Sequence, residues 1–158
     1  MKIFFVWVTI FLSSRCYAQY HKVYDAKYLQ NPPIYPSGID SCQRFYFSHF
    51  KGFDSVLSKL IANGDTAKYI RLYFSFVIDK YGAAYNAHFE KIASTQYAKG
   101  ITSKTVKYFP GKTYYEKLIK EMLMQMPLWK PALLNGLPVD CKIEAHFQFW
   151  VGINPPTN

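Results

Sequence analysis

The chain has 158 residues, of which half are hydrophobic, 19% are aromatic and only 18% are charged. This length and composition indicate one domain with a hydrophobic core and exclude an intrinsically disordered chain. Lys and Arg outnumber Asp and Glu by 19 to 10, for a formal charge of +9, which leaves nucleic acid, an anionic surface or no special partner open. The three cysteines are an odd number, which suggests that one of them is absent from the mature protein.

Residues 1–18 have the pattern of a secretory signal peptide. Lys2 precedes the apolar run 3–12, and small residues follow as far as Ala18. Ten apolar residues match the roughly 7–15 of a signal peptide and fall short of the roughly 20 that span a membrane. We therefore expect export to the periplasm or the medium with Gln19 as the new N-terminus, and an uncleaved anchor is the alternative. Cleavage would remove two cations and one cysteine.

The segment after the signal peptide predicts an extended lead-in followed by two short helices. Residues 19–40 lack periodicity and are broken by proline and glycine, which favours extended structure. Ser41 can cap a helix over 41–53, and 56–62 has the pattern of a second helical piece. The apolar side of the first helix is formed by Cys42, Phe45, Tyr46 and Phe50.

Alternating apolar residues over 70–78 predict a half-buried strand. The turn residues 79–82 and the apolar stretch 83–92 predict that this strand continues into a hairpin. Alternation in the second strand fails at Asn86, which predicts a β-bulge. The polar residues 94–112 are expected to form a long connection.

The C-terminal third predicts one helix and one long strand. Thr113 and Glu116 have the spacing of a capping box, and the helix should end before Pro127. Its apolar residues at helical spacing are Tyr115, Ile119, Met122, Leu123 and Met126. Alternation over 139–150 predicts a strand with one apolar face.

These elements predict an α+β domain over residues 41–152, followed by a disordered tail over 153–158. Each strand has only one strongly apolar face to bury, so we expect a two-layer fold with helices packed on one face of a three-stranded antiparallel sheet.

Several segments resemble the C-terminal domain of the TonB energy transducers, a fold of the TonB/TolA type. The resemblance rests on 126–132 (MPLWKPA), 135–139 (NGLPV) and the alternating last strand. It extends back to 74–82 (FSFVIDKYG) and, more weakly, to 34–38 (IYPSG). The residues of this motif are Tyr35, Pro36, Pro127, Trp129, Lys130, Pro131, Asn135 and Gly136. All of them have structural roles, in turns, helix ends and packing.

The resemblance implies a domain that binds a peptide or protein by strand addition beside its last strand, such as the periplasmic segment of an outer-membrane receptor. The family's membrane span and proline-rich stalk are missing between Ala18 and Pro32, so we expect an envelope transport accessory, with a shortened inner-membrane-anchored transducer as the alternative. The residues expected to contact the partner are Asp140, Lys142, Glu144, His146, Gln148 and Trp150. Packing under the lead-in is the alternative role for Trp150.

An enzymatic or metal-binding function is not expected. The four histidines (His21, His49, His88 and His146) lack the spacing of a zinc site, and no nucleophile, P-loop or dinucleotide motif is present. We expect no cofactor.

The two cysteines that would survive cleavage, Cys42 and Cys141, lie on apolar faces, so a disulfide and two buried thiols are both open. The lysine-rich stretch 104–120 superficially suits nucleic acid, but export argues against that partner. Membrane contact is expected only if the N-terminal segment is uncleaved.

Overall fold

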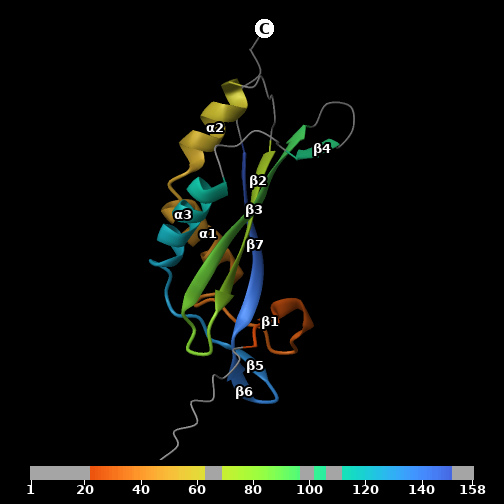
Figure 1. The fold of residues 1–158 in the computed structure, drawn as a ribbon, viewed down its shortest axis with the longest axis vertical. Helices are drawn as coiled ribbons and strands as arrows, with labels where there is room; N and C mark the ends of the chain where they lie inside the picture. Colours follow the sequence, from red (N-terminus) through yellow and green to blue (C-terminus); the bar gives the residue numbers. More distant parts are fainter. Residues whose placement is uncertain (1–21, 63–68, 97–101, 106–111, 151–158) are drawn as a thin grey trace, which may run out of the picture.

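The computed structural model describes residues 22–62, 69–96, 102–105 and 112–150 (Figure 1). The predicted signal peptide and C-terminal tail lie outside these residues. Within them, helices cover one face of a sheet, and a small hairpin extends from one end of it. The α+β class predicted from the sequence is confirmed.

The main sheet has five strands in the order β1-β7-β2-β3-β4. Its centre is formed by β2 (Tyr69–Ile78), which pairs antiparallel with both β3 (Ala84–Gln96) and β7 (Cys141–Trp150). At one edge β1 (Tyr24–Asp25) pairs parallel with β7, and at the other β4 (Thr102–Thr105) pairs antiparallel with β3. The sheet is therefore mixed and wider than the three antiparallel strands that we expected.

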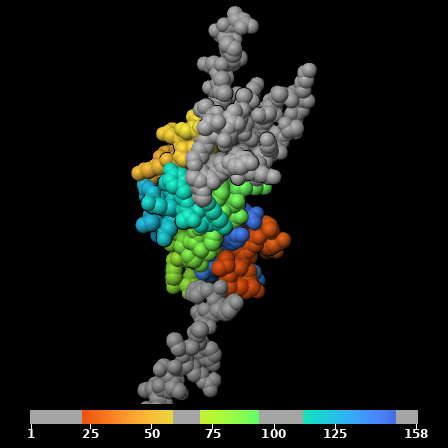
Figure 2. All heavy atoms as spheres, turned by 45° about the horizontal axis from the view of Figure 1, so that its top comes forward, coloured from red at the N-terminus to blue at the C-terminus, as the bar shows by residue number. Residues whose placement is uncertain are grey.

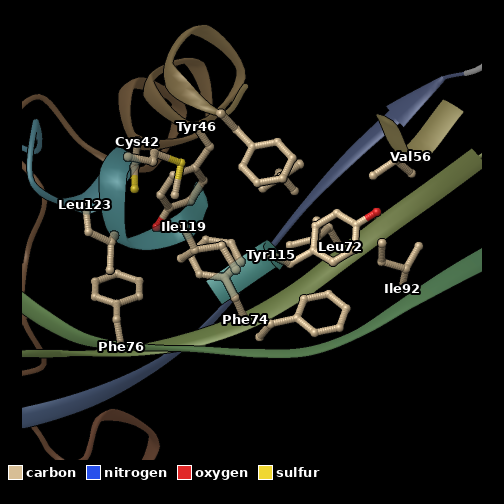
Figure 3. Packing of buried hydrophobic residues seen from close by; sticks show 14 of the residues in the cluster. Cys42, Tyr46, Val56, Leu72, Phe74, Phe76, Ile92, Tyr115, Ile119 and Leu123 are labelled. Atoms are coloured by element: carbon tan, nitrogen blue, oxygen red, sulfur yellow. The ribbon is translucent and has the colours of Figure 1, made fainter. Parts of the chain in front are cut away.

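Three helices lie on the same side of this sheet (Figure 1). They are α1 (Ile39–His49), α2 (Phe53–Ala62) and α3 (Lys112–Leu123). Their apolar faces meet the inward face of β2, where five alternating residues are all fully or almost fully buried: Ile70, Leu72, Phe74, Phe76 and Ile78. Figure 3 shows several of these side chains directed at Tyr46 of α1 and at Tyr115 and Ile119 of α3.

The predicted bulge in β3 is confirmed. Asn86 has a positive φ of 54°, and the pairing with β2 shifts register between Ser75 and Val77. A second shift, between Tyr73 and Phe74, has no counterpart in the sequence pattern. These irregularities explain why β3 does not alternate strictly, although it pairs with β2 along its length.

The predicted start of the first helix is wrong by two residues. The helix begins at Ile39 with Gly38 as its N-cap, and Gly38 has a φ of 82°. Ser41 is the third residue of this helix and not its cap, and its hydroxyl accepts a hydrogen bond from the Arg44 guanidinium at 2.9 Å. The start of this helix is set by the positive φ of Gly38, a conformation that glycine tolerates. Gly38 has no side chain to cap the helix, so the pattern of capping residues did not indicate it.

The capping box predicted at Thr113 is also wrong, because α3 already includes Lys112. The Glu116 carboxylate instead lies 3.6 Å from the Lys112 ammonium and 3.7 Å from His88 Nδ1. Its role is to link α3 to β3.

Part of the predicted connection over 94–112 belongs to the sheet. β3 continues to Gln96, and β4 pairs with its last four residues. Thr and Lys side chains suit an edge strand, which needs no alternating apolar pattern.

A small hairpin precedes the last strand. It consists of β5 (Ala132–Leu134) and β6 (Leu137–Val139), and Asn135 and Gly136 form the turn with φ values of 52° and 80°. The turn predicted at this Asn-Gly pair is confirmed. Val139, which we assigned to the long last strand, belongs to the hairpin.

Candidate functional site

The most distinctive surface is the edge of β7 that faces away from β2. The backbone N–H of Tyr24 donates to the carbonyl of Asp140 (2.9 Å), so this carbonyl points outward, toward β1. Backbone groups point the same way at every second residue of a strand. The N–H and C=O groups of Glu144, His146 and Gln148 therefore also point outward, and we call them the outer edge of β7.

The chain itself covers the beginning of this strand. Tyr24 pairs with Cys141 and Asp25 with Lys142, after which the chain turns into the short 3-10 helix η1 (Ala26–Tyr28). Within the described part of the chain, β7 has a strand neighbour on this side only at these two residues. The predicted contact stretch from Asp140 onward is thus paired with β1 at its start and, among the described residues, has no strand partner on this side farther along.

The lead-in is part of the fold and not a loose extension. Asn31 and Ile34 form isolated bridges with Leu133 and Lys130, and backbone hydrogen bonds of 2.9–3.0 Å join the segments. In Figure 2 the red and orange lead-in lies directly beside the blue atoms of β7. The lead-in is consequently held at a fixed place next to the outer edge.

A groove of about 350 Å³ runs between the lead-in, α1 and β7. Its residues are Ala26, Pro32 and Pro33 from the lead-in, Ile39, Cys42, Gln43 and Tyr46 from α1, Trp129, and Ile143, Glu144, Ala145 and His146 from β7. We call it the edge groove. It is largely apolar, with a few polar groups from α1 and β7, as is usual for sites that bind extended segments.

Trp129 forms one wall of this groove and is 7% exposed. Its ring meets Tyr35 edge-on at 5.1 Å between centroids and Phe76 at 6.0 Å, and its Nε1 donates to Met126 Sδ. Its backbone N–H donates to the carbonyl of Gly82 at 2.9 Å. The predicted structural role of this tryptophan is consistent with these contacts, which join the lead-in to the sheet.

The other motif residues lie in turns and at the ends of elements. Tyr35 is buried and Pro36 is exposed at the turn before α1; Pro127 is exposed after α3. Lys130 bridges to Ile34 of the lead-in, and Pro131 is half-buried just before β5.

The six residues expected to contact a partner have different environments. Glu144 and His146 are exposed, Lys142 is half-buried, and half-buried Gln148 accepts a hydrogen bond from Arg71. The His146 ring lies 5.5 Å from that of Tyr73. The backbone of Trp150 pairs with Tyr69, and its side chain lies outside what the structure describes.

Asp140 is only 6% exposed and has a structural environment. Its carboxylate accepts hydrogen bonds from the backbone N–H of Lys80 (2.9 Å) and the hydroxyl of Tyr85 (3.1 Å). Burial, together with this hydrogen bond, raises the pKa of Tyr85, which therefore remains a donor at neutral pH. Asp140 joins the start of β7 to the β2–β3 hairpin.

Both described cysteines are buried, free thiols and do not form the disulfide considered from the sequence. The Cys141 thiol lies 3.8 Å from the carbonyl of Lys142, and Cys42 lies beside Tyr46 on α1. Burial raises the pKa of Cys141 to about 11 and raises that of Cys42 as well. Neither thiol is activated as a nucleophile at neutral pH.

Among the described residues, no group of three or more His, Cys, Asp or Glu side chains could hold a metal ion. His49 lies within hydrogen-bonding distance of the Phe45 carbonyl and His88 is close to Glu116, while His21 lies outside the described residues. No helix in the described ranges has the length and apolar character needed to cross a membrane.

Sequence reasoning identified β7 but missed the opposite walls of the edge groove. Ala26, Pro33, Ile39 and Gln43 have no motif in common, and the proline and glycine breaks of the lead-in and the resemblance at 34–38 did not indicate a binding surface. The walls come together through pairing of distant backbone segments.

Comparison with known proteins adds no relative: no family model, no curated protein and no solved structure matches the chain.

Proposed function

We propose that this chain is an exported protein- or peptide-binding domain of the TonB C-terminal type, which binds an extended partner segment by adding it as a strand to the outer edge of β7. The observation that carries the proposal is the outer edge itself. Among the described residues, β1 pairs with β7 only at Cys141 and Lys142, and Glu144 and His146 farther along line the edge groove.

An added strand would satisfy backbone groups that the sheet leaves facing outward. Exposed edges invite pairing with another chain, and proteins that bind peptides by strand addition use this property. Alternate side chains of the partner would point toward the helix layer, where Ile39, Pro33 and Ala145 offer an apolar lining. The preferred partner is therefore an extended segment with apolar residues at alternate positions, such as the periplasmic segment of an outer-membrane receptor.

Replacing Glu144 by proline should weaken partner binding at least about tenfold, roughly 1.4 kcal/mol. The Glu144 N–H points outward, so proline removes a donor that β7 offers to the added strand and leaves the pairing with β2 intact. The measurement is the Kd of a fluorescein-labelled probe peptide, selected on the intact protein from a displayed random-peptide library.

The matched control is Glu144→Ala, which keeps the N–H and removes the carboxylate. We expect this variant to lose much less affinity for the probe peptide than Glu144→Pro, because it keeps the backbone N–H. Circular dichroism checks that both variants retain the fold. A folded Glu144→Pro protein with wild-type affinity would refute the use of this edge.

Replacing Ile39 by serine should weaken binding of the same probe peptide about fivefold, which corresponds to roughly 1 kcal/mol of lost apolar contact. Ile39 is 69% exposed in the free protein, so the fold does not depend on its side chain. The control is Leu137→Ser, because Leu137 is 70% exposed and lies on the β5–β6 hairpin. Equal Kd values for the two variants would show that the groove wall takes no part in binding.

A further inference from the structure

One outward-facing backbone carbonyl of β7 already accepts a hydrogen bond from a side chain. Gln43 lies on α1, is half-buried and lines the edge groove. Its Nε2 donates a hydrogen bond to the backbone carbonyl of His146 at 3.3 Å. The outer edge is therefore not bare: α1 supplies a donor at the position where an added strand would supply a backbone N–H.

The chemistry of this side chain suits that role. A primary amide carries an N–H donor and a C=O acceptor, the same two groups that a peptide unit offers to a neighbouring strand. In this structure the amide of Gln43 takes the place of one backbone N–H donor of a strand. Proteins often protect exposed edges in this general way, since a free edge pairs indiscriminately.

We propose that Gln43 is a placeholder for the partner strand. This inference rests on the proposed function. On binding, a backbone N–H of the partner takes the carbonyl of His146, and the amide of Gln43 is displaced from it. A segment that uses this carbonyl must offset the loss of this internal bond through its other contacts with the edge groove. Gln43 therefore lowers the affinity of every such segment by the same factor, and segments with few other contacts do not bind.

The decisive variant is Gln43→Met, which keeps the length and most of the volume of the side chain and removes the donor. We expect the probe peptide to bind this variant two- to fivefold more tightly than the wild type, the range for one modest hydrogen bond that no longer has to be broken. The unfolding transition in urea should be unchanged, because an exposed bond of this length contributes little to stability.

A matched control exists on α3. Gln125 Nε2 donates to the backbone carbonyl of Glu121 at 3.0 Å, and Gln125 is exposed and is not part of the edge groove. Gln125→Met removes the same kind of bond and should leave the Kd unchanged. A second readout is the side-chain amide resonance of Gln43 in ¹⁵N NMR, which should move toward the position of a water-exposed amide when the probe peptide is added.

The outcomes separate the two proposals. Equal or weaker binding by Gln43→Met, with Glu144→Pro still defective, would overturn the placeholder and leave strand addition in place. A tightening of the same size in Gln125→Met would also overturn it. Binding that is insensitive to Glu144→Pro, or a library that yields no binder to the wild type, would overturn the proposed function and the placeholder together.

Discussion

Replacing Phe147 by alanine is expected to lower the free energy of unfolding by about 3–5 kcal/mol. Phe147 is fully buried on β7. Among the described residues, its ring lies within 6.4 Å, centroid to centroid, of six aromatic rings: Tyr46, Phe47, Phe50, Phe53, Phe74 and Phe149. These rings come from α1 and its C-cap residue Phe50, from α2, and from β2 and β7, so truncation opens a cavity where the two layers meet.

Urea denaturation followed by circular dichroism measures this loss, and the slope of the transition should stay constant. The control is Phe47→Ala. Phe47 belongs to the same cluster and stacks on Phe53 at 5.8 Å, but it is 42% exposed. We expect Phe47→Ala to lower the free energy of unfolding by about 1 kcal/mol, because Phe47 buries less apolar area than Phe147. If both variants lost the same stability, the cluster would be loosely packed and Phe147 would not be its centre.

The strands of the sheet centre could be predicted because the pattern that forms them is local. In β2 and β7 large apolar side chains alternate with other residues, and those of β2 from Ile70 to Ile78 are buried as the pattern predicts. Ser75 and Val77, on the other face of β2, are buried as well, so the second half of this strand is not half-buried as we expected. β1 and β4 have no such pattern. They pair over only two and four residues, and β1 pairs with a segment that is distant in the sequence.

In the candidate site, too, the part set by a local sequence pattern could be predicted and the part set by pairing of distant segments could not. Resemblance to the TonB C-terminal domain pointed to the last strand, and the alternation of β7 gave the residues on its polar face. The sequence could not show which backbone groups of β7 lack a strand partner. β1 pairs with Cys141 and Lys142 through backbone hydrogen bonds, and these depend on no particular residue type in the lead-in. The position of Gln43 beside His146, 103 residues away, depends equally on the packing of α1.

Replacing Gly82 by alanine should lower the free energy of unfolding by at least about 3 kcal/mol. Gly82 closes the β2–β3 turn with a φ of +92°, which disfavours any other residue, and an added Cβ would lie 2.1 Å from the carbonyl oxygen of Trp129. That oxygen belongs to the backbone and cannot rotate away. Relief requires Trp129 to move, and Trp129 packs on both Tyr35 and Phe76.

Gly136→Ala separates steric contact from backbone strain. Gly136 has a similar φ of +80°, but nothing lies within 4 Å of its Cβ position. Gly136→Ala should lower the free energy of unfolding by only about 1–2 kcal/mol, which is the strain of a non-glycine residue in the left-handed conformation. Urea denaturation of both variants gives the difference, which reports the contact with Trp129. Equal losses would mean that Trp129 is free to shift, and the wall that it forms in the edge groove would then be adjustable and not fixed by the β2–β3 turn.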